Sequence, residues 1–275
     1  MDPVTTGNPS PNPSPPTQPQ EPRFDARGLV ELDARVPRVA EIDGTTATFD
    51  ARELTTRQIN LELRWLLYEQ GVREVTVGNP GARHSLGAGL LTRCRLNFEG
   101  SLGYFALGMI DGPEVHIAGR VGWSACENMM SGVVVIDSNA GSLTGAAIRG
   151  GDLVIKGRVG ARTGIDQKGG TIIALGDAGS MTGFMMQRGR QILCGDVGPG
   201  LGDSMYDGEI YVAGRVKSLG VDCVEGEWTD ADTELIERKF AIYELGSPPH
   251  FSKFVCGKKL YNYDALEPSE RKLVL

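Results

Sequence analysis

The sequence predicts a mainly β protein: a right-handed, single-stranded β-helix of about seven 19-residue coils, with a small α/β N-terminal cap and a C-terminal helix and tail. Glycine supplies 38 of the 275 residues, about twice its usual share. Many of these glycines recur every 19 residues, and apolar residues recur at the same interval in short strand-like stretches. The expected divisions are 1–23 for a tail, 24–80 for the cap, 81–224 for the β-helix and 225–275 for the C-terminal helix and tail.

The N-terminal tail is rich in proline and poor in apolar side chains. Residues 1–23 hold eight of the fifteen prolines, and Met1 and Val4 are almost the only apolar side chains there. Such a segment cannot bury enough surface to offset the entropy lost on ordering. The sequence therefore predicts a disordered, partly polyproline tail.

The cap combines two strands with one helix. The stretch 29–32 has the pattern of a strand, and Glu74–Val77 has the pattern of another. Between them, a threonine at 55 or 56 can N-cap a helix that runs to about Gln70 and ends at Gly71.

Four glycine columns define the coils. The second, third and fourth columns follow the first by three, seven and thirteen residues. Glycine suits corners where the backbone needs a positive φ or where two backbones approach closely. The first column contains Gly100, Gly119, Gly157, Gly176, Gly195 and Gly214, with Ser138 in the one remaining place.

The apolar columns between the glycines require the coils to stack. Ordering one coil costs on the order of 20–40 kcal/mol, whereas burying its four apolar side chains returns roughly 6–12 kcal/mol. A coil is therefore stable only when neighbouring coils pair their strands and share an interior. The open ends of such a stack need covers. We expect the α/β cap to cover one end, and a helix over Thr229–Phe240 to cover the other.

Charge and composition exclude several classes of protein. The net charge of −7 and the pI near 5.1 argue against binding to nucleic acid or to an anionic membrane. No apolar run reaches the ~20 residues of a membrane span, and the N-terminus lacks the pattern of a signal peptide, so we expect a cytoplasmic protein. Five scattered cysteines without a CxxC are typical of reduced core thiols rather than of disulfides or a zinc site.

The sequence offers no convincing catalytic, cofactor-binding or metal-binding residue. Carboxylates in phase on adjacent coils could in principle cleave glycosides, but the same phase also holds arginines, which indicates a solvated corner of mixed charge. No histidine shares a phase with Cys126 or Cys194, and GxxxxGK[ST] is absent. The carboxylate pairs are Asp177 with Asp196 and Asp203 with Asp222.

One column points outward and is apolar over its later members. It lies three residues before each leading glycine, on the strand face opposite the interior. An exposed apolar stripe of this size would mark an interface with a partner subunit. The alternative is that the cap helix of the same chain covers the stripe through Trp65 and Leu66. The candidate interface residues are Val135, Val154, Ile173, Ile192 and Tyr211.

Several longer strings resemble a known family over roughly residues 45–265. They are similar to the C-terminal β-helix (GXGXG) domain of the glutamate synthase large subunit. They most resemble its stand-alone form, a subunit of three-part glutamate-synthase-like enzymes that include N-methylglutamate synthase. The proline-rich start departs from that pattern. The strings are Glu127–Gly132, Cys194–Asp196, Leu201–Ser204, Val216–Cys223 and Lys259–Tyr263.

The resemblance implies a structural subunit that is inactive alone and holds no cofactor. Its expected partners are an amidotransferase-like subunit, which releases ammonia from glutamine, and a subunit with FMN and an iron–sulfur cluster, which acts on 2-oxoglutarate. The β-helix would dock the two and help wall a path for ammonia or an amine. The glycine pattern alone is shared with the glycine-repeat subunits of formylmethanofuran dehydrogenase and of the formyltransferase/hydrolase one-carbon complex. A free-standing β-helix binding module is the third interpretation.

Overall fold

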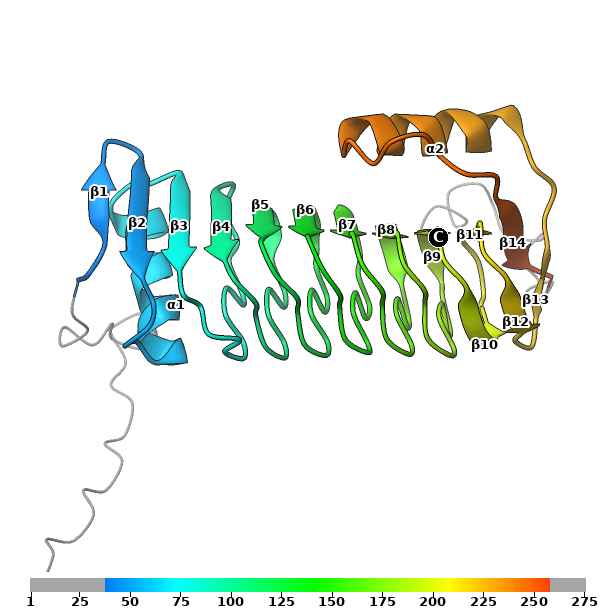
Figure 1. The fold of residues 1–275 in the computed structure, drawn as a ribbon, viewed down its shortest axis with the longest axis horizontal. Helices are drawn as coiled ribbons and strands as arrows, with labels where there is room; N and C mark the ends of the chain where they lie inside the picture. The colour runs from blue at the N-terminus through cyan, green and yellow to red at the C-terminus, as the bar shows by residue number, and fades with distance from the viewer. Residues whose placement is uncertain (1–37, 258–275) are drawn as a thin grey trace, which may run out of the picture. The chain divides into compact units, whose positions relative to one another are not determined.

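The computed structural model describes residues 38–257 and shows a β-solenoid of about eight turns with two α-helices (Figure 1). The predicted mainly β fold of stacked coils is confirmed. The proline-rich tail, the strand expected over 29–32 and the string Lys259–Tyr263 lie outside the described residues.

The described strands form one large sheet and one small one. The order of the 12-stranded sheet is β1-β2-β3-β4-β5-β6-β7-β8-β9-β11-β14-β13. β10 (Val197–Leu201) and β12 (Val216–Leu219) form a separate parallel pair. The strands of the large sheet are β1 (Glu41–Asp43), β2 (Thr46–Asp50), β3 (Glu74–Gly78), β4 (Arg95–Glu99), β5 (Asp111–Ile117), β6 (Ser131–Ile136), β7 (Asp152–Ile155), β8 (Lys168–Ala174), β9 (Arg188–Leu193), β11 (Glu209–Val212), β13 (Cys223–Glu225) and β14 (Ser252–Cys256).

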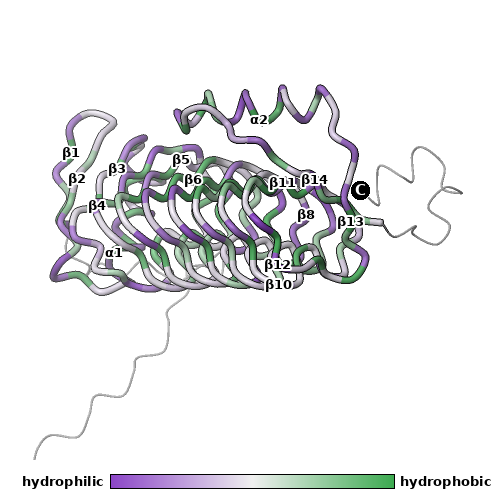
Figure 2. The backbone as a smooth tube through the Cα atoms, turned by 45° about the vertical axis from the view of Figure 1, so that its right-hand side comes forward, coloured by the Kyte–Doolittle hydropathy of each residue, from purple (hydrophilic) through white to green (hydrophobic). Residues whose placement is uncertain are grey.

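From β4 to β11, the strands of the large sheet pair in parallel with the 19-residue register that the sequence predicts. Ile136 pairs with Ile155, and Ile155 pairs with Ala174. Each column thereby becomes a ladder inside the stack, and the tube in Figure 2 shows the coils as a continuous spiral. Every member of the ladder two residues before the leading glycine is 2% exposed or less: Phe98, Ile117, Ile136, Ile155, Ala174, Leu193 and Val212.

The leading glycines are required by close backbone approach. A Cβ on Gly195 would lie 2.5 Å from the backbone nitrogen of Asp177 and from the carbonyl carbon of Gly176, in the preceding coil. No real Cβ tolerates such distances, so the coils can stack this closely only where a side chain is lacking.

A second corner of each coil uses left-handed backbone conformations. Arg162, Gly164 and Asp166 all have φ between 55° and 64°, and the residues in phase in neighbouring coils repeat this pattern. The amide of Arg162 donates to the carbonyl of Ser180 in the next coil, and the amide of Gly164 donates to the carbonyl of Thr144 in the previous one. This corner is therefore hydrogen-bonded in both directions along the stack, although it is not a regular strand.

The N-terminal region joins the sheet directly. α1 (Thr56–Arg64) begins at a capping box formed by Thr55 and Gln58, and it continues as the π-helical turn η1 (Trp65–Glu69), so the predicted helix is confirmed. β2 and β3 were expected to belong to a separate cap, yet β3 pairs in parallel with β4 and the sheet runs on without a break. This continuation explains why the structure has more turns than the seven expected.

The C-terminal helix is present but does not cover the end of the stack. α2 (Asp230–Ile242) has the expected position in the sequence and begins at a capping box of Thr229 and Asp232. It lies alongside the strands of the C-terminal half (Figures 1 and 2). The prediction that it closes the end is wrong, because β14 pairs antiparallel with β11 and with β13 and occupies that place. In the part of the chain described, no helix combines the length and apolar character needed to cross a bilayer.

Candidate functional site

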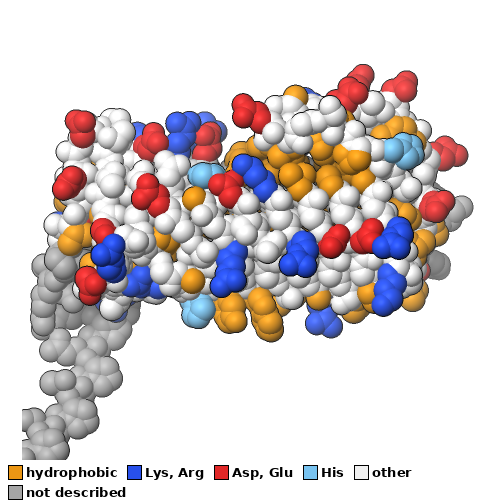
Figure 3. All heavy atoms as spheres, viewed as in Figure 1, with side chains coloured by type: hydrophobic (Ala, Val, Ile, Leu, Met, Phe, Trp, Pro, Cys, Tyr) orange, Lys and Arg blue, Asp and Glu red, His pale blue; other side chains and the backbone are white. Residues whose placement is uncertain are grey.

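The predicted interface column lies beneath α2. Val154, Ile173, Ile192 and Tyr211 are completely buried, and Val135 is partly buried at the margin of the same cluster. Figure 3 shows hydrophobic side chains gathered between α2 and the strands. The expectation of an exposed stripe is therefore wrong for these four residues. The side chains that cover them include Ile236, Phe240 and Phe251.

The chain does cover its own stripe, as the alternative proposed, but with a different helix. Leu66 belongs to the main hydrophobic core, and Trp65 packs against that core. The sequence could not distinguish the two helices, because both present apolar residues at helical spacing. We call the buried interface between α2 and the strands beneath it the α2 seam.

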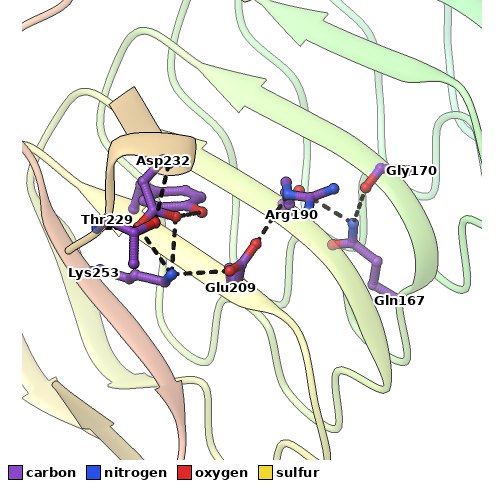
Figure 4. A network of polar contacts seen from close by, with 8 residues as sticks. Gln167, Gly170, Arg190, Glu209, Thr229, Asp232 and Lys253 are labelled. Atoms are coloured by element: carbon purple, nitrogen blue, oxygen red, sulfur yellow. Dashed lines mark hydrogen bonds and ion pairs between the residues drawn. The ribbon is translucent and has the colours of Figure 1, made fainter. Parts of the chain in front are cut away.

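A polar network fixes the N-terminal end of α2 (Figure 4). The Tyr211 hydroxyl donates to Asp232 Oδ1 at 2.6 Å, and Lys253 Nζ lies 2.9 Å from the same oxygen. Lys253 also lies 3.0 Å from Glu209, which accepts from Arg190 Nε at 3.0 Å. This chain of charges links β9, β11, β14 and α2.

The environment of Asp232 holds it in its charged form. Burial acts to raise the pKa of Asp232, but hydrogen bonds from Tyr211, Lys253 and Thr229 outweigh burial and hold that pKa at about 2. A buried carboxylate is stable only when it is paired in this way. Burial, followed by the hydrogen bond to Asp232, raises the pKa of Tyr211 well above its usual value, so this phenol stays protonated.

A second polar contact fixes the other end of α2. Lys239 Nζ donates to Asp152 Oδ1 at 2.6 Å, and the Tyr243 hydroxyl donates to the other oxygen of the same carboxylate. Both ends of α2 are thus anchored to strands of the solenoid. α2 is held by apolar packing along its length and by ionic contacts at its two ends.

A groove of about 620 Å³ runs along a glycine corner close to these anchors. Its lining includes Asp152, Arg190 and Glu209, whose charges already pair within the chain. Arg188 also lines the groove, and its buried Nη2 atom makes no hydrogen bond to the described residues. Glycines make up much of the lining: Gly132, Gly150, Gly151, Gly169, Gly170, Gly189 and Gly208.

A row of stacked aromatic side chains is exposed on a different corner. His84 and Tyr104 stack with ring centroids 4.6 Å apart, and Tyr104 and Trp123 stack with centroids 5.7 Å apart. About half of the surface of Tyr104 and of Trp123 is exposed. We call the three stacked residues His84, Tyr104 and Trp123 the aromatic ladder. It was not predicted from the sequence, although the spacing of 19 between Tyr104 and Trp123 is the signal that places them in one column.

The structure also places the cysteines and carboxylates that were candidates for catalysis. Cys126 is fully buried, and burial raises the pKa of its thiol to about 12. Asp196 accepts a hydrogen bond from Arg215 at 2.7 Å, which lowers the pKa of that carboxyl, and Asp177 accepts one from the backbone of Asp196. Among residues 38–257, no group of three His, Cys, Asp or Glu side chains is arranged to hold a metal ion.

Comparison with known proteins finds a similar sequence in a bacterium. The chain is 45% identical over 202 residues to Protein GlxC of Rhizobium meliloti (strain 1021). The aligned part is 71% of this chain and 88% of GlxC. No protein-family model matches the chain.

Proposed function

The chain belongs to the family of Protein GlxC, and from this premise we propose that it is a structural subunit of a glutamate-synthase-like complex. The observation that carries the proposal is the 45% identity over most of the length of GlxC, which fits the resemblance of the sequence strings to the stand-alone glutamate-synthase β-helix subunit. We infer that this chain contributes no catalytic residue and holds no cofactor.

The expected partners are an amidotransferase-like subunit and a subunit that carries FMN and an iron–sulfur cluster. The solenoid suits the task of holding two such subunits at a fixed separation. Its coils are hydrogen-bonded to their neighbours along the strands and again along the left-handed corner. A stack bonded on several sides resists bending, and it therefore keeps surface sites on different coils at constant distances.

The aromatic ladder is the surface that we expect a partner subunit to bind. Tyrosine and tryptophan supply much of the binding energy in protein interfaces when a partner covers them. Stacking against one another holds the rings of the ladder in place before binding, so little side-chain entropy remains to be lost. The α2 seam cannot serve in the same way while α2 is docked, because its apolar residues are already covered.

The test is purification of the tagged full-length chain from its native cell, followed by mass spectrometry and an absorbance scan for flavin. An FMN-bearing partner together with an amidotransferase-like partner is the expected result. Copurification of an amidohydrolase-like or formyltransferase protein would instead place the chain in a one-carbon complex. A colourless chain without partners would indicate a free-standing binding module and would overturn the proposal.

Ammonia or amine transfer between the partners gives a second, functional test. If the chain helps to wall the path, a complex reconstituted without it should still hydrolyse glutamine in the amidotransferase subunit. The same complex should lose coupling, so that ammonia escapes into solution instead of appearing in product. Unchanged coupling without this chain would contradict both the wall and the docking role, because the omitted chain is proposed to supply both.

A further inference from the structure

Two cysteines that are far apart in the sequence face each other at the C-terminal end of the sheet. β13 and β14 are antiparallel neighbours, and Cys223 pairs directly with Cys256. The sequence showed only five scattered cysteines, because this pairing depends on the return of the chain after α2.

The backbone hydrogen bonds reveal which kind of antiparallel pair this is. The amide of Gly257 donates to the carbonyl of Asp222 at 2.8 Å, so the bond joins the residues that flank Cys223 and Cys256. The next bond of the same kind joins Gly226 to Lys253 at 2.9 Å. Cys223 and Cys256 therefore form a non-hydrogen-bonded pair. In such pairs the Cα atoms lie about 4.5 Å apart and the side chains are closest, which is within the range that a disulfide spans.

Both sulfur atoms lie against the same turn of the preceding coil. Cys256 Sγ lies 3.1 Å from the carbonyl oxygen of Met205. A Cβ on Gly202 would lie 2.8 Å from Cys223 Sγ. Burial, followed by the nearby Cys256, raises the pKa of the Cys223 thiol to about 11.

We propose that Cys223 and Cys256 form an oxidisable dithiol that closes to a disulfide across β13 and β14 when a hydroperoxide is present. Cys256 reacts first, because it is partly exposed whereas Cys223 is buried. Its sulfur attacks the O–O bond, which breaks, and Cys256 becomes a sulfenic acid while the hydroperoxide leaves as an alcohol or as water. The sulfur of Cys223 then attacks the sulfenyl sulfur, the S–S bond forms, and one water leaves. The two thiols together lose two electrons and two protons, and the hydroperoxide gains them.

Closure would restrain α2 as well as the end of the sheet. The segment between the two cysteines contains the whole of α2, so the disulfide closes a loop around it. β14 also supplies Lys253, which holds Asp232 of α2. The bond would therefore limit the freedom of this segment when α2 detaches, and the oxidised protein should be more stable than the reduced one.

The test is peptide mapping of the purified full-length chain before and after treatment with hydrogen peroxide, with remaining thiols alkylated. The expected product is an intrachain link between the peptides of Cys223 and Cys256, lost on treatment with dithiothreitol. The melting temperature should rise by roughly 5–15 °C on oxidation, as a disulfide that closes a loop of this length predicts. Cys194→Ser is the matched control and should leave both effects intact, whereas Cys256→Ser should abolish them.

Two results would overturn the proposed dithiol, a third would overturn its proposed effect on α2, and none of them requires a variant to fold. Over-oxidation of Cys256 to sulfinic acid while Cys223 still alkylates would show that the two sulfurs do not meet. A link to another cysteine, or between two chains, would show that the pair is not the reactive one. A closed link without any rise in melting temperature would remove the proposed effect on α2. All three readouts are independent of whether the chain assembles with partner subunits.

Discussion

Truncation of Phe240 to alanine tests whether apolar packing holds α2 on the solenoid. Phe240 is 2% exposed and packs edge-on against Phe251, with ring centroids 6.2 Å apart. Removing a buried phenylalanine ring costs about 3–5 kcal/mol, of which about 0.5–1.5 kcal/mol belongs to the pair of rings. The lost free energy should mainly weaken the docking of α2, because Phe240 belongs to the cluster between α2 and the strands and not to the main core.

Amide hydrogen exchange measures this loss segment by segment. A cost of 3–5 kcal/mol corresponds to an increase of roughly 10²- to 10⁴-fold in the opening of α2. Amides of β5 to β9 should keep the protection of the wild-type protein. Ile242→Ala is the matched control on the same helix: its side chain is 57% exposed, so its effect should stay within about 0.5 kcal/mol.

Two outcomes of the exchange experiment would refute the reasoning. Unchanged exchange in α2 would mean that the ionic contacts at its ends suffice to hold it. An equal rise in α2 and in β5 to β9 would mean that the helix and the solenoid unfold as one unit, and that α2 is not a separately docked element.

Three further predictions follow from the packing, the charges and the exposed rings. Gly195→Ala should lower the free energy of unfolding by about 1–3 kcal/mol in thermal unfolding, because its Cβ would overlap the preceding coil. Gly108→Ala is the control and should have little effect, because a Cβ there meets only ordinary contacts. Equal effects of the two variants would contradict close backbone approach as the reason for glycine at position 195. The pKa of Asp232 is lowered to about 2, so the stability that this carboxylate gives to α2 should be complete above about pH 4 and lost as the pH falls toward 2. In hydrogen-exchange experiments, α2 of the Asp232→Asn variant should be less protected at neutral pH and should show no further loss of protection over this pH range. Trp123→Ala should reduce recovery of partner subunits in copurification at least tenfold with the melting temperature nearly unchanged, while Val221→Ser, at another exposed apolar side chain, should not; equal recovery from both would remove the aromatic ladder as an interface.

The repeat made most of the solenoid predictable from sequence. Spacing alone placed Ile136, Ile155 and Ala174 in one ladder, because each coil repeats the geometry of the last. The helix expected over Thr229–Phe240 was also placed correctly, and Thr229 proves to be its N-cap.

The elements that break the repeat were not predictable in the same way. The position of α2 depends on the length and direction of the chain that returns to β14, and no periodicity describes that path. The pattern of Val154 and Ile192 was correctly assigned to the outer strand face, but an apolar outer face does not reveal what covers it. The aromatic ladder and the facing of Cys223 and Cys256 became visible only when the coils and the last strands were placed in space.

Because its coils repeat every 19 residues, the solenoid can change in length only by whole coils. Neighbouring parallel strands are about 4.8 Å apart, so each whole coil that is added or removed changes the separation of sites on either side by that step. A change of one or a few residues does not produce an intermediate length, because the strand spacing stays the same and the change is absorbed in a local irregularity, as between Pro199 and Leu201, where the register of β10 and β12 shifts. In a protein that holds partners apart, distance would therefore evolve in units of one coil, and deletion of residues 157–175 would bring the aromatic ladder and the dithiol closer by one such unit.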